Sequence, residues 1–421
     1  MNLEKQITNY FLTLFSIIPL TIIIGSSASI LNILLIDISF LVYILYKKDF
    51  FFLKSKPIIY LFILYIYLIF NSLISYSLNE SFLRNFGFIR IIILFAAFNY
   101  FFLDKNFFKT VFYVWSLTIF IVLVDIYIEG ITGKNILGNN GFDIIGSRRI
   151  VSFFKDEPVV GSYLNAFFLI LIPFLFHELK KWRLFLTFFI TILFIVAIII
   201  TGERSSSIKA FLALIVFLAL MDSAASSKKK IILILSIIIV TTATISNSQY
   251  LKNRFINQIK HALTKHTIYF DLYKSGYEVF KNNVIFGTGN KNYRIVSCQK
   301  IDKKKIVTQK YFCNTHPHQI YLEFLSEHGI FGTLLTFFIF FKLFFSKKIF
   351  TIRKSNYIKL GSLLYLCFTF MPILPSGAFF GNFLITLFAI NLSIFYASDI
   401  DSNIFRYRFD NQIKKKGPLA Q

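Results

Sequence analysis

Five ionisable side chains lie close together in the stretch "NTHPHQIYLEFLSEHGIFG", residues 314–332, immediately before a long apolar run. They are His316, His318, Glu323, Glu327 and His328. An imidazole changes its protonation state near neutral pH, so a histidine here is suited to take a proton from an attacking hydroxyl group. A lone histidine at the start of a helix is more often a cap, and both interpretations stay open at this point.

A second group of residues places positive charge at the ends of apolar runs: Arg90, Arg148, Arg149, Arg204 and Lys209. Guanidinium groups donate paired hydrogen bonds that fit the oxygens of a diphosphate. A helix that begins at Arg204 would add the partial positive charge of its N-terminus. A base and an arginine-lined anion site are the parts required for glycosyl transfer from a lipid diphosphate. Extension of Arg90 and Lys209 to lipid phosphates is the competing interpretation.

Other chemistry is not indicated. His316 and His318 are two residues apart, which is weak spacing for a pair of metal ligands, and the chain has no phosphate-binding glycine loop and no nucleophile elbow. The spacing of Gly329 and Gly332 is typical of close helix packing. For Asp125, an ion pair with an arginine is the simple expectation.

The composition predicts a membrane protein. Of 421 residues, 56% are hydrophobic and 19% are aromatic, and apolar windows long enough to cross a bilayer recur along the chain. The formal charge of +24 lies mainly in short clusters between these windows, which membrane topology explains better than nucleic-acid binding. We therefore expect an all-α, polytopic membrane protein with about twelve transmembrane helices and no nucleic-acid partner.

The twelve predicted helices cover residues 7–24, 28–46, 57–77, 86–103, 107–128, 159–177, 183–201, 206–221, 231–246, 319–345, 357–376 and 378–397. With the N-terminus inside, every short basic cluster between them is cytoplasmic, as the positive-inside rule requires. Two longer segments, 129–158 and 247–318, then lie outside, and the candidate site residues face that same side. The stretch 267–281 predicts an amphipathic helix that lies along the membrane surface or caps the bundle.

The chain divides into three parts on this interpretation: N-terminal transmembrane helices (1–144), a core with the large outer loop (145–346), and C-terminal helices with a basic tail (347–421). The first helix is expected to remain uncleaved. Cys298 and Cys313 lie in the large loop and form a disulfide or remain two free thiols. Cys367 is expected to be a small apolar packing residue.

Four stretches together resemble the O-antigen ligase and O-antigen polymerase superfamily of bacterial membrane proteins. "HQIYLEFLSEHGIFG" fits the pattern of the ligases, with His318, Gln319, Gly329 and Gly332 at the expected places. The others are "RRIVSFFKDEPVVGSYL", "TGERSSS" and "VFKNNVIFGTGNKNY", so the resemblance covers roughly residues 145–345. One departure concerns the ligases' common Ser-Arg-Gly, which is Glu203-Arg204-Ser205 here. The family also has an arginine in the large loop, and neither Arg254 nor Arg294 aligns securely with it.

The resemblance implies a GT-C-like, metal-independent, inverting glycosyltransferase that uses undecaprenyl-diphosphate-linked glycans at the periplasmic face of the bacterial inner membrane, without a cofactor. It maps the motif histidine onto His318, the expected base, and the diphosphate site onto Arg204 and Arg149, with Arg148 beside them. Three supporting residues are expected: Glu157, Glu203 and Arg90. The two carboxylates would orient the arginines or the acceptor, and ordinary ion pairs are the competing interpretation.

The family includes polymerases and ligases, which share a donor and differ in acceptor. A polymerase extends another lipid-linked repeat, and a ligase delivers the glycan to a lipid A core or a protein. Polymerase is favoured only because polymerases of this kind are numerous. The alternative is a flippase for lipid-linked sugars, which would need polar groups near the midplane rather than at one face.

Overall fold

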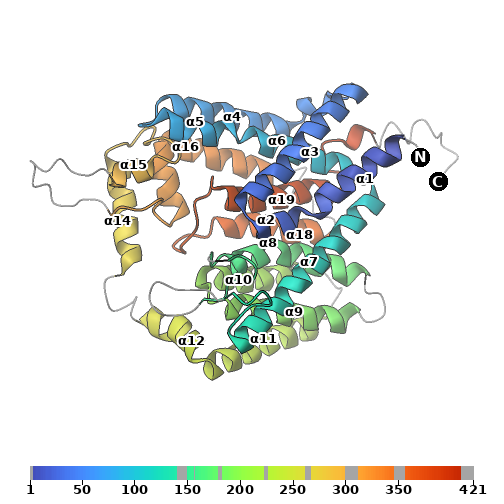
Figure 1. Ribbon diagram of the computed structural model, residues 1–421, viewed down its shortest axis with the longest axis vertical. Coiled ribbons are helices and arrows are strands. Elements are labelled where there is room, and N and C mark those ends of the chain that lie inside the picture. The colour runs from blue at the N-terminus through green and yellow to red at the C-terminus, as the bar shows by residue number, and fades with distance from the viewer. Residues whose placement is uncertain are drawn as a thin grey trace, which may run out of the picture.

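The structure is a computed structural model that describes residues 3–139, 149–155, 157–178, 183–221, 226–260, 267–298, 312–345 and 356–408. These residues contain helices and connecting loops, with no strand among them (Figure 1). The predicted all-α class is therefore confirmed.

The helices of the N-terminal part follow the predicted apolar runs. They are α1 (Leu3–Ser16), α2 (Ile18–Ile24), α3 (Ser26–Lys47), the 3₁₀ turn η1 (Phe51–Lys54), α4 (Lys56–Leu73), α5 (Leu78–Phe86), α6 (Ile89–Phe101) and α7 (Lys105–Thr132). The first predicted helix is a pair, α1 and α2, bent by 43° where Pro19 enters the first turn of α2. Asp104 caps α7 by accepting hydrogen bonds from the backbone N–H groups of Asn106 and Phe107.

The central and C-terminal helices complete the bundle. They are α8 (Val160–Glu178), α9 (Arg183–Ile200), α10 (Arg204–Leu220), α11 (Ser227–Asn247), α12 (Gln249–Lys252), the π turn η3 (Asn253–Asn257), α14 (Ile268–Lys281), α15 (Tyr293–Cys298), α16 (Ile320–Phe345), α18 (Tyr357–Thr369) and α19 (Asn382–Ala397). Each of the twelve predicted runs thus coincides with a helix or a helix pair.

Seven helical segments among the described residues are long and apolar enough to cross a membrane, and the bent α1–α2 pair would make eight. Helices α9, α18 and α19 are apolar but shorter than that limit. Leucine, isoleucine and phenylalanine side chains such as Ile38 and Leu334 are exposed, as expected for a surface in contact with lipid. The chain is therefore a polytopic membrane protein.

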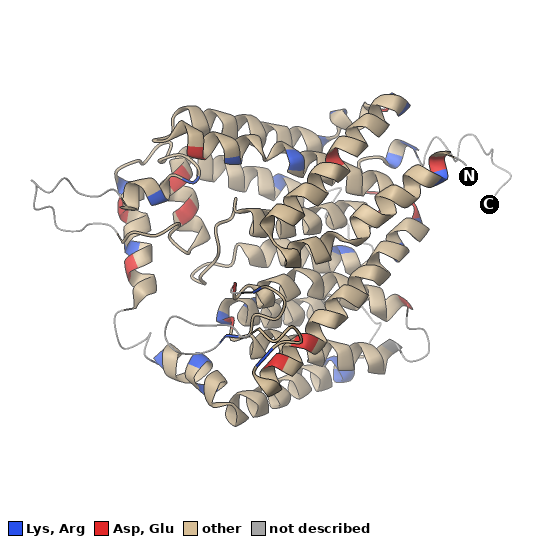
Figure 2. Ribbon diagram, in the orientation of Figure 1, with Lys and Arg blue, Asp and Glu red and all other residues tan. Residues whose placement is uncertain are grey.

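Helices α14 and α15 lie at one end of the molecule, and both termini lie at the other (Figure 1). Charged residues gather on α14, α15 and the adjacent end of α16, whereas most turns of the long helices carry none (Figure 2). The predicted amphipathic helix is α14, and it packs on the start of α16: a Cβ atom on Gly276 would lie 2.8 Å from the Pro317 side chain. Capping of the bundle is thus the interpretation that the contacts favour.

Two helix predictions were wrong in part: one missed a loop between helices, and the other missed a break within a helix. The runs 357–376 and 378–397 are separated by an extended connection, residues 370–381, because Pro372, Pro375 and Gly377 do not continue a helix. The predicted helix 319–345 is broken at Gly329, whose φ is 64° and ψ is −170°. We call residues 370–381 the α18–α19 loop.

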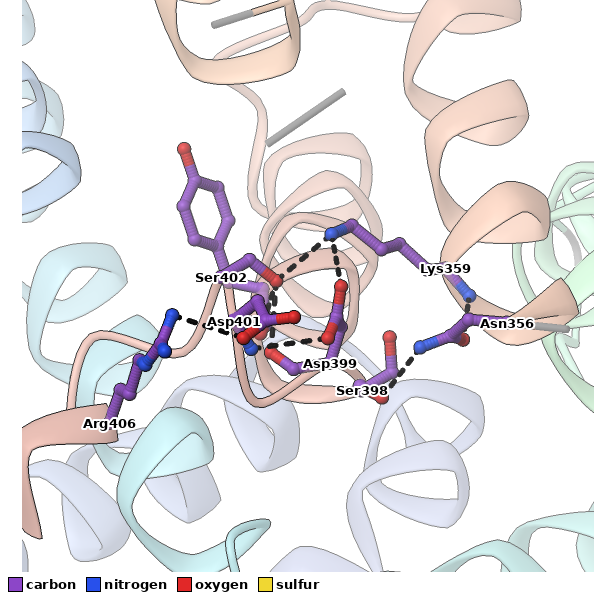
Figure 3. Close-up of polar contacts among 8 residues, drawn as sticks. Asn356, Lys359, Ser398, Asp399, Asp401, Ser402 and Arg406 are labelled. Carbon is purple, nitrogen blue, oxygen red and sulfur yellow. Dashed lines mark hydrogen bonds and ion pairs between the residues drawn. The ribbon is translucent and has the colours of Figure 1, made fainter. Parts of the chain in front are cut away.

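A buried ion pair joins α18 to the end of α19. The ammonium of Lys359 lies 2.7 Å from Oδ2 of Asp399 and donates to the Ser402 hydroxyl at 3.2 Å (Figure 3). Their charged side chains are 0% and 5% exposed. Asn356 caps α18 on the backbone N–H of Lys359, so the start of one helix and the end of the next are held together.

Candidate functional site

His318 is held by its backbone beside the α18–α19 loop. Its φ is +54°, a conformation that a residue with a side chain rarely adopts, and its carbonyl oxygen accepts a hydrogen bond from the Ser376 N–H at 2.9 Å. Its imidazole has no hydrogen-bond partner among the described residues and is half-buried. The ring therefore remains available to a ligand.

Gln319, not His318, is the cap of α16. The Gln319 side-chain oxygen accepts a hydrogen bond from the Leu322 N–H at 2.8 Å. This is the geometry of an N-cap, in which a side chain satisfies one of the free N–H groups of the first turn. The capping interpretation of His318 thus loses its structural basis.

His316 packs against His318 with ring centroids 4.0 Å apart. Its Nε2 lies 3.3 Å from the Ser376 carbonyl oxygen, and its Nδ1 lies 3.0 Å from the Thr315 hydroxyl. Because a carbonyl oxygen only accepts, Nε2 must carry the proton, which leaves Nδ1 as an acceptor in the neutral ring. His316 is therefore occupied by structural hydrogen bonds that His318 does not make.

Burial sets the protonation of both rings. It lowers the pKa of His316 to about 3, with smaller contributions from His318, Arg294 and Arg84. Burial also lowers the pKa of His318. Both imidazoles are then neutral at pH 7, which is the form that a general base requires.

Two tyrosines of α14 lie over the same segment. The Tyr269 ring contacts the His318 ring edge-to-face at 6.3 Å, and the Tyr273 hydroxyl donates to the Ile373 carbonyl oxygen at 3.0 Å. Helix α14 is thereby attached to the α18–α19 loop as well as to α16.

The carboxylates of α16 are buried near Arg84, which no sequence pattern singled out, and near Arg294, whose alignment with the loop arginine of the family was not secure. Glu323 accepts two hydrogen bonds from the Phe379 N–H, at 3.0 and 3.1 Å, and Glu327 accepts one from the Tyr293 N–H at 3.1 Å. Arg84 and Arg294 interact electrostatically with Glu327. No spacing links residue 84 to residue 294, so only the fold reveals this charge cluster.

The stretches "VFKNNVIFGTGNKNY" and "HQIYLEFLSEHGIFG" are hydrogen-bonded to each other on both sides of the Gly329 break. Backbone N–H groups of Thr288 and Gly289 donate to the carbonyls of Ser326 and Glu327, both at 2.9 Å. Beyond the break, the Ile330 N–H donates to the Val284 carbonyl at 2.8 Å. The glycines and asparagines of the first stretch therefore shape the base of the helix that carries the second.

The turn "TGERSSS" presents Arg204 at the first position of α10. Its guanidinium makes no hydrogen bond or ion pair with any residue that the structure describes, and it is half-buried. Arg254 donates to the Gly202 carbonyl at 3.2 Å and the Tyr250 hydroxyl donates to the Thr201 carbonyl at 3.1 Å. Arg254 and Tyr250 thus hold the backbone of the turn, while the Arg204 guanidinium stays available to a ligand.

Glu203 is tied to the start of α8. Its carboxylate accepts hydrogen bonds from the backbone N–H of Gly161 at 2.6 Å and of Ser162 at 3.0 Å, and from the hydroxyls of Ser162 and Ser206 at 2.8 and 3.0 Å. Burial raises the pKa of Glu203, and these hydrogen bonds oppose the shift. These contacts are those of a helix cap, and no arginine is among its partners in the described chain.

The remaining predicted site residues lie on the connection before α8 and on α6. Arg149 is half-buried, and Arg148 lies outside the described residues. Glu157 lines a pocket of about 330 Å³. The Arg90 guanidinium donates to Oδ1 of Asn382 at 2.8 Å, so it faces protein and not only lipid. Lys209 likewise reaches protein, donating to the Thr369 carbonyl at 3.4 Å.

Asp125 does not pair with an arginine as expected. It accepts hydrogen bonds from the Ser152 hydroxyl at 2.5 Å and from the Ile136 N–H at 2.7 Å, and Glu129 accepts one from the Ser152 N–H at 2.7 Å. The end of α7 thereby holds the segment that follows Arg149.

The described residues show the state of the three cysteines and whether metal ligands cluster among them. Cys298 and Cys313 are joined by a disulfide. No group of three or more histidine, cysteine, aspartate or glutamate side chains there is arranged to hold a metal ion. Cys367 is half-buried and free of any disulfide, as a packing residue would be.

Of the predicted basic residues, Lys209 and Arg90 contact the two ends of the α18–α19 connection, and the two histidines contact its middle. Lys209 on α10 contacts the end of α18, Ser376 contacts both histidines, and Asn382 contacts Arg90. The arginines that influence the His316 ring are Arg84 and Arg294. The structure thus adds two arginines to the histidine side of the site.

Comparison with known proteins gives one result. Residues 189–337 match the model of the O-antigen ligase family. The match begins in α9 and ends in α16, and includes the Arg204 turn, α14 and His318. No curated protein matches the chain.

Proposed function

Because residues 189–337 form an O-antigen ligase domain, we propose that the protein is a membrane glycosyltransferase that polymerises or ligates surface polysaccharide. The donor is an undecaprenyl-diphosphate-linked glycan, and the acceptor is another lipid-linked repeat or a lipid A core. The observation that carries the proposal is the free, neutral imidazole of His318, held by its backbone within the family's matched segment.

The chemistry follows from the parts of the site. His318 takes the proton of an acceptor hydroxyl, whose oxygen attacks the anomeric carbon of the donor sugar. The bond from that carbon to the diphosphate oxygen breaks, and the configuration inverts. Arg204 and Arg149, with Arg148, stabilise the negative charge on the departing polyprenyl diphosphate. Glu157, Glu203 and Arg90 support this site.

Arg204 is the best supported diphosphate ligand. It stands at a helix N-terminus, where the partial positive charge of the helix adds to its own, and it has no described protein partner. Its turn is rigidly held by Arg254 and Tyr250. A guanidinium that is held in place and has no protein partner is suited to bind the diphosphate that leaves during transfer.

We further propose that all twelve apolar helices cross the bacterial inner membrane and that the site faces the periplasm. The basic clusters then lie inside, and the Cys298–Cys313 disulfide lies on the oxidising side, where such bonds persist. The end of the molecule that carries α14 and α15 would project from that face (Figure 1).

The test is a gel of lipid A-linked and undecaprenyl-linked glycans from a deletion strain complemented with wild type or His318→Ala. A core with a single repeat unit in the deletion strain identifies a polymerase, and a bare core with long polymer on the carrier identifies a ligase. Full rescue by His318→Ala would overturn the catalytic assignment. If the protein were a flippase instead, the deletion strain would keep the carrier-linked glycan on the cytoplasmic face, where periplasmic enzymes cannot reach it.

A further inference from the structure

A pocket of about 330 Å³ lies between the α2–α3 turn, the segment before α8, and the start of α19. Neither the histidine pair nor the Arg204 turn lines it, and it adjoins the proposed transfer site through Glu157, one of the supporting residues. We call it the α2–α19 pocket. The α18–α19 loop connects the two places: Ser376 contacts the histidines, and Asn382, six residues later, lines the pocket. A chain of six residues spans at most about 20 Å.

Two residues that are largely buried open their hydroxyl groups onto this pocket without a protein partner. Ser29 and Thr386 are only 7% and 2% exposed, yet both line the pocket, and neither hydroxyl makes a hydrogen bond with a described residue. In most helices a serine or threonine hydroxyl bonds to its own backbone, so these two hydroxyls remain available to a group that enters the pocket. Two such groups that line one cavity indicate a ligand that accepts hydrogen bonds.

The other polar groups of the pocket are mostly donors. Lys155 makes no ion pair with a described residue, and Asn382 uses its Oδ1 for Arg90, which leaves its amide N–H groups free. The first turns of α3 and α19 both border the pocket, so their unpaired backbone N–H groups add positive potential. Glu157 is the one carboxylate in the lining, and it suits a sugar or water hydroxyl. The balance favours an anion.

One wall of the pocket is apolar and reaches the lipid-facing surface. It is formed by Ile22, Ile23 and Ile24 of α2, with Phe154 and Phe383, and Ile24 is 58% exposed. An anion that enters beside this wall would carry an apolar chain into the bilayer. The volume of the pocket suits a head group rather than a whole lipid.

We propose that the α2–α19 pocket binds the phosphate of a lipid, with Ser29, Thr386, Asn382 and Lys155 as donors and the lipid chain running over Ile22–Ile24. This inference rests on the proposed function only for its choice of carrier lipid, because lipid phosphate is also the chemistry of an ordinary phospholipid. In the carrier case, the pocket is a second lipid-phosphate site next to the transfer site.

The experiment measures binding of tritiated geranylgeranyl monophosphate to the full-length protein in uncharged detergent, in an Arg204→Gln background that removes the proposed donor site. Binding is expected to persist there and to weaken about tenfold or more in Ser29→Ala and in Thr386→Val, because each loses a hydrogen bond to a charged group. Thr336→Val is the matched control: Thr336 is equally buried and its hydroxyl is also unpaired, but it does not line the pocket.

Four competitors define the ligand: phosphatidylglycerol, a prenyl phosphate, inorganic phosphate and uncharged geranylgeraniol. Unlabelled phosphatidylglycerol that displaces the probe identifies a general phospholipid site, and displacement only by prenyl phosphates identifies a carrier site. Inorganic phosphate should compete weakly because it lacks the apolar chain. Unchanged affinity in both pocket variants, or equal competition by uncharged geranylgeraniol, would overturn the proposal. Loss of transfer in His318→Ala bears on the proposed function and leaves this result unaffected.

Discussion

At the scale of residues, the two histidines of "HPH" differ in their contacts: the His316 ring makes two hydrogen bonds, and the His318 ring makes none with a described residue. A histidine at a helix start next to carboxylates is a local pattern, and the resemblance singled out the second histidine of "HPH". The contacts of His316 with Ser376, and the nearness of Arg84 and Arg294, join residues that lie between about 20 and more than 200 positions apart. No local pattern encodes such contacts, so these partners emerged only from the folded chain.

The pH dependence of transfer tests the protonation of His318. Burial lowers the pKa of His318 below the usual 6.5, so the neutral base persists as the pH falls to 6.5. We expect the initial rate to fall on the acid side as the imidazole gains a proton, with the half-maximal rate below pH 6.5. Rates measured in buffers of constant ionic strength check this. A half-maximal rate above pH 6.5 on the acid side would contradict it.

At the scale of elements, helix positions were predictable and helix interruptions were not. Each predicted apolar run marked a helix or a helix pair, and seven segments among the described residues, or eight with the α1–α2 pair, are long and apolar enough to cross a bilayer. The break in α16 depends on a close approach of residues 284–289, which lie some 45 positions upstream. "PILPSG" could have signalled the α18–α19 loop, because two prolines interrupt the apolar run there.

Substituting Gly329 should disrupt this break. A Cβ atom there would lie 2.3 Å from the Ile285 carbonyl oxygen, and φ is positive. Gly329→Ala is expected to lower the free energy of unfolding by about 3 kcal/mol or more. Gly377→Ala is the control, because a Cβ atom at Gly377 meets nothing within 4 Å. Unfolding by SDS titration in mixed micelles measures both, and equal stabilities would refute the packing described.

At the scale of the whole molecule, the fold class and the distribution of charge followed from composition. The polar contacts that fasten helices together did not, because they pair residues within otherwise apolar runs. Lys359 and Asp399 lie 40 positions apart in the sequence, and the structure brings them together as a buried ion pair (Figure 3). The α2–α19 pocket also joins three distant segments, and so no single stretch predicts it.

Removing the ammonium of Lys359 should destabilise the bundle. Lys359→Met leaves Asp399 buried without its partner, and a loss of about 3–5 kcal/mol in the free energy of unfolding is expected. Lys109→Met breaks an ion pair with Glu178 in which the lysine is 49% exposed, and it should change the free energy of unfolding far less, because solvent screens an exposed pair. If SDS titration finds the two variants equally stable, the buried ion pair does not hold α18 and α19 together.

Thiol labelling tests the proposed orientation. In a Cys367→Ala background, Asn139→Cys and Lys274→Cys should react with a membrane-impermeant maleimide in intact spheroplasts, because both positions are exposed on the proposed outer side. Asn106→Cys, exposed at the opposite end of α7, should react only after the membrane is opened. The reverse pattern would invert the topology and remove the site from the periplasm.

The central claim is that His318 is the base for glycosyl transfer. The most direct test is the initial rate of transfer by purified protein in liposomes supplied with an undecaprenyl-diphosphate-linked glycan and an acceptor, comparing wild type, His318→Ala and His177→Ala, an exposed histidine at the end of α8. We predict a fall of about 10²–10⁴-fold for His318→Ala, with an unchanged unfolding midpoint, and no change for His177→Ala. A His318→Ala rate within fivefold of wild type would contradict the account.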